Sequence, residues 1–227
     1  MARHHRQAPR SLSRRAAVVS FTAFLPWAGC TEVPRNYDAA QSPRGELLFA
    51  DDFERGALGV RWRPTGPGAE IVQGALKIED IENHPLWLDL RLPPDLRVEF
   101  DAWAGSEEGD VKIELAGDGE SHATSLNYTA TGYVLIFGGW NNSLNAIVRR
   151  NEHGRNRSTV KDPRVIPDRR YRMAITRIGP EIRWEIDGRE ILVYEDPRPL
   201  TGKGHEFFAF SGWQAPTFFD NLRIEAL

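Results

Sequence analysis

GYVLIFGGWNNSLNAIVRRNEHG, residues 132–154, is the stretch from which we infer the fold. Two apolar runs, YVLIF and AIV, flank the sequence GGWNN. Glycine and asparagine favour the backbone conformations of a tight turn, so we predict a β-hairpin that reverses at residues 138–142. Trp140 in that turn leaves two interpretations open. The indole either packs against the end of the sheet or belongs to a surface that holds a ligand.

The same pattern of short apolar segments separated by turn signals continues through the rest of the chain. From Glu46 to Leu227 we count about a dozen short strand-like segments between turn signals, with no helical period over ten or more residues. The pairs Gln73–Gly74 and Asp187–Gly188 are hairpin signals, the second being the stronger. Such a chain is expected to form a two-sheet sandwich or a barrel.

Alternation within the segments separates the two faces of each strand. Apolar and polar residues alternate in RVEFDAW (97–103), VKIEL (111–115), YRMAITR (171–177) and EIRWEID (181–187). Side chains two residues apart share a face of a strand, so each segment offers one face to a core and one to solvent. This pattern is typical of antiparallel sheets and predicts an all-β fold.

Composition limits the class of protein. The chain has 227 residues, 41% of them hydrophobic, and a net charge of −3, as expected for a globular protein that does not bind nucleic acid. The histidines are scattered, which gives no support to a transition-metal site. No glycine-rich phosphate loop opens a helix, and the single cysteine allows no disulfide within one chain.

The first 44 residues have a separate character. Residues 1–15 are basic, residues 16–26 (AAVVSFTAFLP) are apolar, and WAGC follows, so we predict an export signal over residues 1–29. Cys30 after Ala28–Gly29 resembles the lipobox of bacterial lipoproteins, which implies lipidation at Cys30; a plain signal followed by an inert thiol is the alternative. Arg14–Arg15 leaves the export route, general or twin-arginine, open.

The domain boundaries follow from these segments. We predict a lipidated cysteine and a flexible tether over residues 30–44 and one β-sandwich over residues 45–227. The expected location is the bacterial cell envelope, in the outer membrane or periplasm, with a membrane contact through the lipid anchor. We expect a monomer.

Five segments in this order carry a family resemblance: LFADDFERGALGVRW (48–62), GAEIVQGALKI (68–78), RVEFDAW (97–103), WEIDGREI (184–191) and FFDNLRIEAL (218–227). The order resembles the concanavalin A-like lectin/glucanase superfamily, particularly its laminin G-like and 3-keto-disaccharide hydrolase-like domains. The resemblance covers almost the whole mature chain and implies a two-sheet antiparallel jelly-roll sandwich. It also implies that a glycan is bound or cleaved on a concave sheet.

The resemblance suggests where catalytic acids would stand. Family-16-type glucanases carry Glu-x-Asp-x-Glu on one strand, and here Glu99 and Asp101 match the first two positions while Trp103 replaces the third. Retaining hydrolysis needs two carboxyl groups across the sugar, with Glu114 or Glu152 as the second member. The alternative for Glu99 and Asp101 is an ordinary solvated strand face.

The terminal strand suggests a metal site. In the resembling proteins an aspartate of this strand helps to bind a structural calcium, and Asp220 shares its face with Leu222 and Ile224. Asp52, near the start of the domain, would be a second ligand. An Asp220 carboxylate that accepts backbone hydrogen bonds without a metal is the alternative.

Sugar rings stack on tryptophan, and their hydroxyls hydrogen-bond to planar polar groups. We therefore expect carbohydrate to bind on one concave face built from Glu99, Asp101, Trp103, Lys112, Glu114, Trp140, Asn141, Asn142 and Arg149. For Trp87 and Trp213 a packing role is expected. The alternative function is an enzyme, either a glycoside hydrolase or a hydrolase or lyase of oxidised sugars that uses Glu99 and Asp101.

Overall fold

The computed structural model describes residues 42–125 and 128–227. The predicted export signal, the lipidation site at Cys30 and most of the tether lie outside the described residues. Among those described, no helix is long and apolar enough to cross a membrane.

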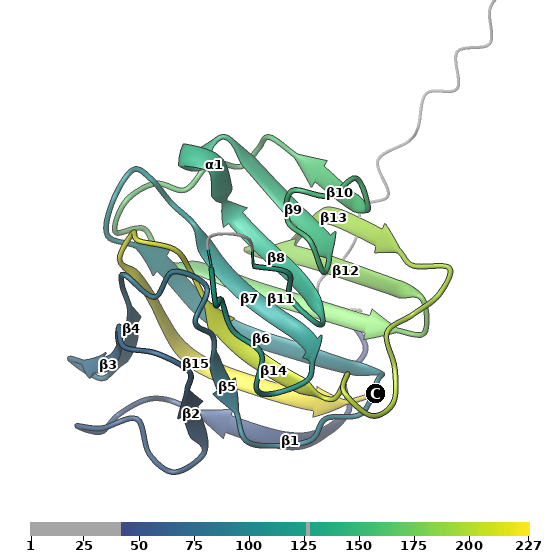
Figure 1. Cartoon of the computed structure of the whole chain (residues 1–227), viewed down its shortest axis with the longest axis horizontal. Helices are drawn as coiled ribbons and strands as arrows, with labels where there is room; N and C mark the ends of the chain where they lie inside the picture. Colours follow the sequence, from purple (N-terminus) through teal and green to yellow (C-terminus); the bar gives the residue numbers. More distant parts are fainter. Residues whose placement is uncertain (1–41, 126–127) are drawn as a thin grey trace, which may run out of the picture. The chain divides into compact units, whose positions relative to one another are not determined.

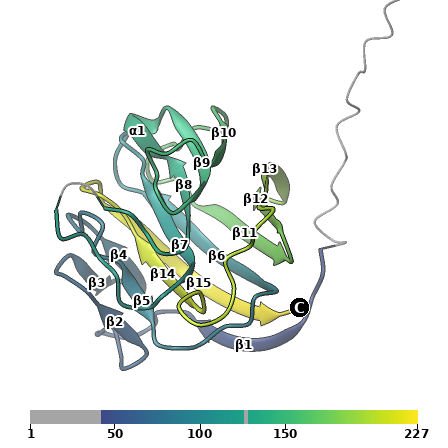
Figure 2. The same ribbon diagram turned by 45° about the vertical axis from the view of Figure 1, so that its right-hand side comes forward.

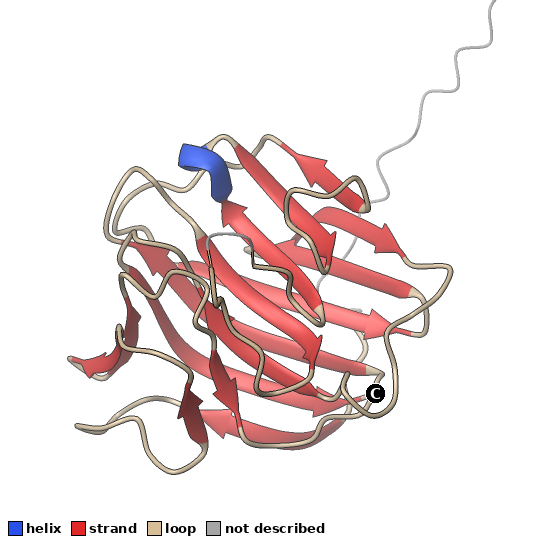
Figure 3. Ribbon diagram, in the orientation of Figure 1, coloured by secondary structure: helices blue, strands red, loops and turns tan. Residues whose placement is uncertain are grey.

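The described residues form two antiparallel sheets, drawn as red strands in Figure 3. Sheet A has eight strands, ordered β13-β12-β11-β6-β15-β4-β3, with β1 also paired to β15. Their bounds are β1 (Glu46–Asp51), β3 (Ala69–Val72), β4 (Ala75–Ile78), β6 (Leu96–Ala104), β11 (Tyr171–Ile178), β12 (Glu181–Ile186), β13 (Arg189–Glu195) and β15 (Thr217–Ala226).

Sheet B has seven strands, ordered β10-β9-β8-β7-β14-β5-β2, and lies in front of sheet A in Figure 1. Their bounds are β2 (Trp62–Pro64), β5 (Leu86–Leu88), β7 (Val111–Gly117), β8 (Tyr133–Gly138), β9 (Leu144–Arg149), β10 (Arg157–Val160) and β14 (Phe207–Ser211). One short turn, α1 (Gly139–Asn142), joins β8 to β9. The all-β jelly-roll sandwich predicted from the sequence is confirmed.

The core lies between the sheets and follows the predicted alternation. Val98, Phe100 and Ala102 of β6 are at most 2% exposed, and the inward residues of β7 (Val111, Ile113 and Leu115) are at most 3% exposed. Phe210 of β14 sits among aromatic rings, with the Phe219 ring centre at 4.2 Å and that of Phe208 at 5.0 Å. Close packing of these rings supplies much of the apolar burial that holds the two sheets together.

Each predicted hairpin forms at its turn signal. Val72 pairs with Ala75 across Gln73–Gly74, and Ile186 pairs with Arg189 across Asp187–Gly188. Both central residues of each turn have positive φ, between 51° and 75°, which is the conformation that matches the twist of the flanking strands. The reversal expected at residues 138–142 is also present, as α1.

The placement of β6 and β7 decides where functional residues can meet. These strands follow each other in the chain, yet β6 belongs to sheet A and β7 to sheet B; Figures 1 and 2 show β6 behind β7. Because both strands turn their apolar faces to the shared core, their polar faces point in opposite directions, outward from sheets about 10 Å apart. The prediction that the polar faces of both strands form one concave surface is therefore wrong.

Candidate functional site

The outer face of sheet A holds Glu99 in an ion-pair network. Its carboxylate lies 2.8 Å from Arg97 Nε, 2.9 Å from Arg44 Nη1 and 3.2 Å from Arg172 Nη2. Burial alone would raise the pKa of Glu99, but hydrogen bonds from Arg44 and Arg97 outweigh it and hold the pKa at about 2. Glu99 is therefore an ionised partner of arginines and holds no proton that a general acid could donate near neutral pH.

The other two residues predicted on this strand also have local partners. Asp101 accepts hydrogen bonds from Arg172 Nη1 at 3.2 Å and from Asn221 Nδ2 at 2.9 Å. The Trp103 ring stacks on Phe218, with ring centres 5.1 Å apart, and the Arg170 guanidinium lies 3.9 Å from its centre. These contacts tie β6 to its neighbours β11 and β15, and they give Glu99, Asp101 and Trp103 a structural role on sheet A.

The two-carboxylate arrangement required by the enzymatic alternative is not formed. Glu99 and Asp101 project from sheet A, whereas Glu114 projects from the outer face of sheet B and Glu152 contacts Lys112 on that same face. A sugar cannot lie between carboxyl groups on opposite sides of the sandwich.

A pocket of about 330 Å³, which we call the Trp140 pocket, opens on the outer face of sheet B. Its volume is at the lower end of the range found for small-ligand sites. Strands β7 and β8, the α1 turn and four loops contribute its lining: Asn83, Glu108, Asp110, Lys112, Ile136, Gly139, Trp140, Asn141, Glu152, His153, Trp213 and Ala215.

A buried ammonium group forms the floor of the Trp140 pocket. The Lys112 side chain is 4% exposed, and its Nζ lies 3.1 Å from Asn83 Oδ1, 3.2 Å from Glu152 Oε2 and 3.6 Å from Asp110 Oδ2. Burial favours the neutral amine, but the charges of Asp110 and Glu152 outweigh it and raise the pKa of Lys112, so the lysine stays charged.

Asp110 retains unused hydrogen-bonding capacity. Its side chain accepts a hydrogen bond from the Trp213 backbone amide, and burial raises its pKa. The Oδ2 atom is buried and has no hydrogen-bond partner among the described residues. A buried acceptor without a partner carries a desolvation cost that a ligand donor would relieve.

The α1 turn holds Trp140 at the rim in an unusual conformation. Trp140, Asn141 and Asn142 have φ values of 52°, 56° and 55°, a left-handed run that costs about 1–2 kcal/mol per residue. The Asn142 side chain fixes the turn, since its Nδ2 donates to the Val165 carbonyl at 2.7 Å and its Oδ1 accepts from the Val165 amide at 2.9 Å. Trp140 and Asn141 therefore face the pocket, while Asn142 acts as a brace.

Glu114 lies on the same face but beneath the surface. Its side chain is fully buried, its Oε2 accepts a hydrogen bond from Tyr128 Oη at 3.0 Å, and its Oε1 has no partner among the described residues. Burial raises the pKa of Glu114 to about 8, so this carboxyl group is largely protonated at neutral pH. It does not line the Trp140 pocket.

Three further predicted residues lie elsewhere. Arg149 is at the sandwich edge, where its Nε donates to Asp196 Oδ2 at 2.8 Å. Trp87 is fully buried and donates to the Ser121 carbonyl, which confirms its packing role. Trp213, expected to pack, lines the pocket. Only the glycine before it in SGWQAP, a sign of a loop rather than a strand interior, could have indicated this.

The residues proposed to bind calcium have other partners. Asp220 Oδ2 lies 3.0 Å from Arg170 Nη1, and its Oδ1 accepts the Asn221 backbone amide. Asp52 Oδ1 accepts the Glu54 backbone amide. Within residues 42–125 and 128–227 no group of three or more histidine, cysteine or acidic side chains is placed to hold a metal ion.

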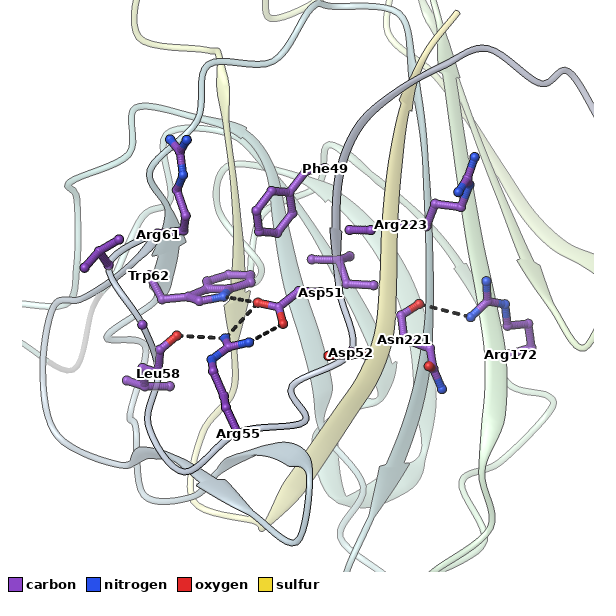
Figure 4. A pocket seen from close by; sticks show the side chains of 14 residues that line it. Phe49, Asp51, Asp52, Arg55, Leu58, Arg61, Trp62, Arg172, Asn221 and Arg223 are labelled. Carbon is purple, nitrogen blue, oxygen red and sulfur yellow. Dashed lines mark hydrogen bonds and ion pairs between the residues drawn. The ribbon is translucent and has the colours of Figure 1, made fainter.

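A larger hollow of about 540 Å³ lies beside β1 and the loop that follows it (Figure 4). Its central carboxylate, Asp51, is occupied by Arg55 Nη2 at 2.8 Å and Trp62 Nε1 at 2.7 Å. Arg172 donates to the Asn221 carbonyl across the hollow. Because these polar groups already bond to one another, the Trp140 pocket is the better candidate site.

No protein-family model matches the sequence, and no curated protein sequence matches it. Solved structures match the fold. A Bacillus subtilis protein of unknown function with a galectin-like fold aligns with a TM-score of 0.62 at 15% identity, over 81% of this chain and 97% of the other. The carbohydrate-binding module CBM66 from Bacillus subtilis aligns at 0.57 and 12% identity, over 75% and 98%. A Bacillus licheniformis β-glucanase aligns at 0.56 and 11% identity, over 81% and 99%. The chain has the concanavalin A-like jelly-roll fold.

Proposed function

We propose that this protein binds carbohydrate in the Trp140 pocket. The observation that carries the proposal is the combination of two tryptophans with a polar floor in one pocket of about 330 Å³. Indole faces suit the C–H faces of sugar rings, and the carboxylates and amides can accept or donate hydrogen bonds to hydroxyls. The unsatisfied Asp110 Oδ2 and the left-handed turn under Trp140 support a ligand role, because such costs persist at binding sites.

The similar structures agree in kind with this proposal. One is named as a carbohydrate-binding module and another as a β-glucanase. Because a fold alone does not determine function, the argument depends on the pocket.

Titration calorimetry with plant, algal and cell-wall oligosaccharides tests the proposal. Trp140→Ala is expected to weaken binding of the responding oligosaccharide about tenfold or more, because tryptophans at the centre of a site carry much of the binding energy. Trp103→Ala, the same change on the outer face of sheet A, is the matched control and should leave the affinity unchanged. The proposal fails if no oligosaccharide binds or if the two variants behave alike.

Binding and hydrolysis are separated by a second measurement. The carboxyl pair predicted for hydrolysis is split between the two sheets, and Glu114 is fully buried, bonded to Tyr128, and does not line the pocket. The proposal therefore expects no increase in reducing ends when the protein is incubated with a bound oligosaccharide. Release of new reducing ends would instead make the protein an enzyme.

We also propose that the protein is exported and anchored through a lipid on Cys30. The basis is the sequence of residues 1–30, with an apolar run that ends in WAGC. Metabolic labelling with a radioactive fatty acid is expected to mark the protein, and Cys30→Ser should abolish the label while Thr31→Ala retains it. A label that persists in Cys30→Ser would contradict the anchor.

A further inference from the structure

The side chains that line the Trp140 pocket carry an excess of negative charge. When His153 is counted as neutral, Lys112 is the only cation among the described lining residues, against three carboxylates: Glu108, Asp110 and Glu152. Another cation, Arg157, lies 5.4 Å from the Trp140 ring centre without lining the pocket. Counting Arg157 as well still leaves one carboxylate in excess.

The single lysine is already engaged by acceptors of the protein. Its Nζ donates to Asn83 Oδ1 at 3.1 Å and forms ion pairs with Glu152 Oε2 at 3.2 Å and, more loosely, with Asp110 Oδ2 at 3.6 Å. An acidic ligand would have to compete with two carboxylates for this ammonium group. It would also face the carboxylates of Asp110 and Glu152, whose side chains are 16% and 17% exposed, so its approach is unfavourable.

The capacity that remains is for accepting hydrogen bonds from a positively charged group. Asp110 Oδ2 has no hydrogen-bond partner among the described residues, its ion pair with Lys112 Nζ being 3.6 Å long, and the Glu152 side chain, which lines the pocket, is 17% exposed. A protonated amine supplies both donors and charge, and tryptophan faces attract cations. We propose that the Trp140 pocket selects sugars that bear a protonated amine over neutral and acidic sugars. This inference rests on the proposed carbohydrate binding.

Four hexamers of equal length test the role of the charge. These are a glucosamine hexamer, an N-acetylglucosamine hexamer, a glucose hexamer and, as the acidic probe, a galacturonate hexamer, each titrated into the full chain at pH 7. We expect the glucosamine hexamer to bind about tenfold or more tighter than either neutral hexamer and the acidic hexamer not to bind. Raising the salt concentration from 0.05 to about 0.5 M should reduce this preference, because exposed charges are screened.

A pair of adjacent residues provides matched variants. Glu108 lines the pocket and Glu107 does not, and both are exposed in the turn before β7, so neither change to glutamine should affect folding. Glu108→Gln is expected to lower the preference for the glucosamine hexamer about threefold, whereas Glu107→Gln should leave it unchanged. Glu152→Gln, deeper in the pocket, should have the larger effect.

The outcomes separate this inference from the function on which it rests. If a neutral hexamer binds as tightly as the glucosamine hexamer, or if the acidic hexamer binds best, selection by charge is wrong while carbohydrate binding stands. Equal effects of Glu107→Gln and Glu108→Gln would place the charge effect outside the pocket and also overturn the inference. If no sugar binds, the proposed function itself fails.

Discussion

Replacing Glu114 with glutamine should change how the stability of the protein depends on pH. Glu114 is fully buried beneath Tyr128, and burial raises its pKa from 4.5 to about 8. In the unfolded chain the same group loses its proton near pH 4.5. Between these values unfolding releases a proton, so the free energy of unfolding falls as the pH rises.

The raised pKa of Glu114 determines how far the free energy of unfolding changes with pH. Each pKa unit corresponds to 1.36 kcal/mol, so the free energy of unfolding should fall by about 4 kcal/mol between pH 5 and pH 8 because of this residue alone. The stabilisation that the protonated Glu114 carboxyl gives to the folded protein is fully present below pH 4.5 and is lost by about pH 8. Glutamine has no proton to lose in this range and is close in shape to the protonated acid, so Glu114→Gln should lack this fall.

Urea denaturation at pH 5, 6, 7 and 8 provides the assay. The difference in free energy of unfolding between Glu114→Gln and the wild type should grow in favour of the variant by about 1.4 kcal/mol per pH unit. Glu195→Gln, at an exposed position of β13, is the control and should follow the wild type throughout. Parallel curves for Glu114→Gln and wild type would refute the reasoning, because they would mean that the buried carboxyl is ionised in the folded protein.

Two other substitutions test the ion-pair network on sheet A and the packing of the core. Arginines hold the pKa of Glu99 at about 2, so the ionised carboxylate stabilises the folded protein above pH 4.5, and this stabilisation is lost as the pH falls toward 2. Glu99→Gln should therefore destabilise the protein by about 2–3 kcal/mol in urea denaturation at pH 7, with little difference near pH 2.5; equal stabilities at pH 7 would contradict the network. Phe210→Ala removes a fully buried ring at the centre of the core and should cost about 3–5 kcal/mol, measured in the same way. A loss below about 1 kcal/mol would show that this ring does not hold the sheets together.

The strands and their turns were predictable because they depend on local properties of the chain. Period-two alternation assigned Val98 and Phe100 to the core and Glu99 and Asp101 to the outer face, and the structure confirms each assignment. The turns at Gln73–Gly74 and Asp187–Gly188 follow from which residues tolerate positive φ. These features need no knowledge of distant neighbours.

The candidate site depended on tertiary structure, because alternation relates a side chain to its own strand and not to the sheet that the strand joins. Glu99 and Lys112 show the same sequence pattern, yet β6 and β7 enter different sheets and turn these residues to opposite sides of the sandwich. Loops distant in the chain then bring Glu152 and Trp213 to the pocket that Lys112 and Trp140 help to line. The chain by itself determined an all-β sandwich and the side of each strand that is polar; packing of two sheets against one core decided which polar residues meet.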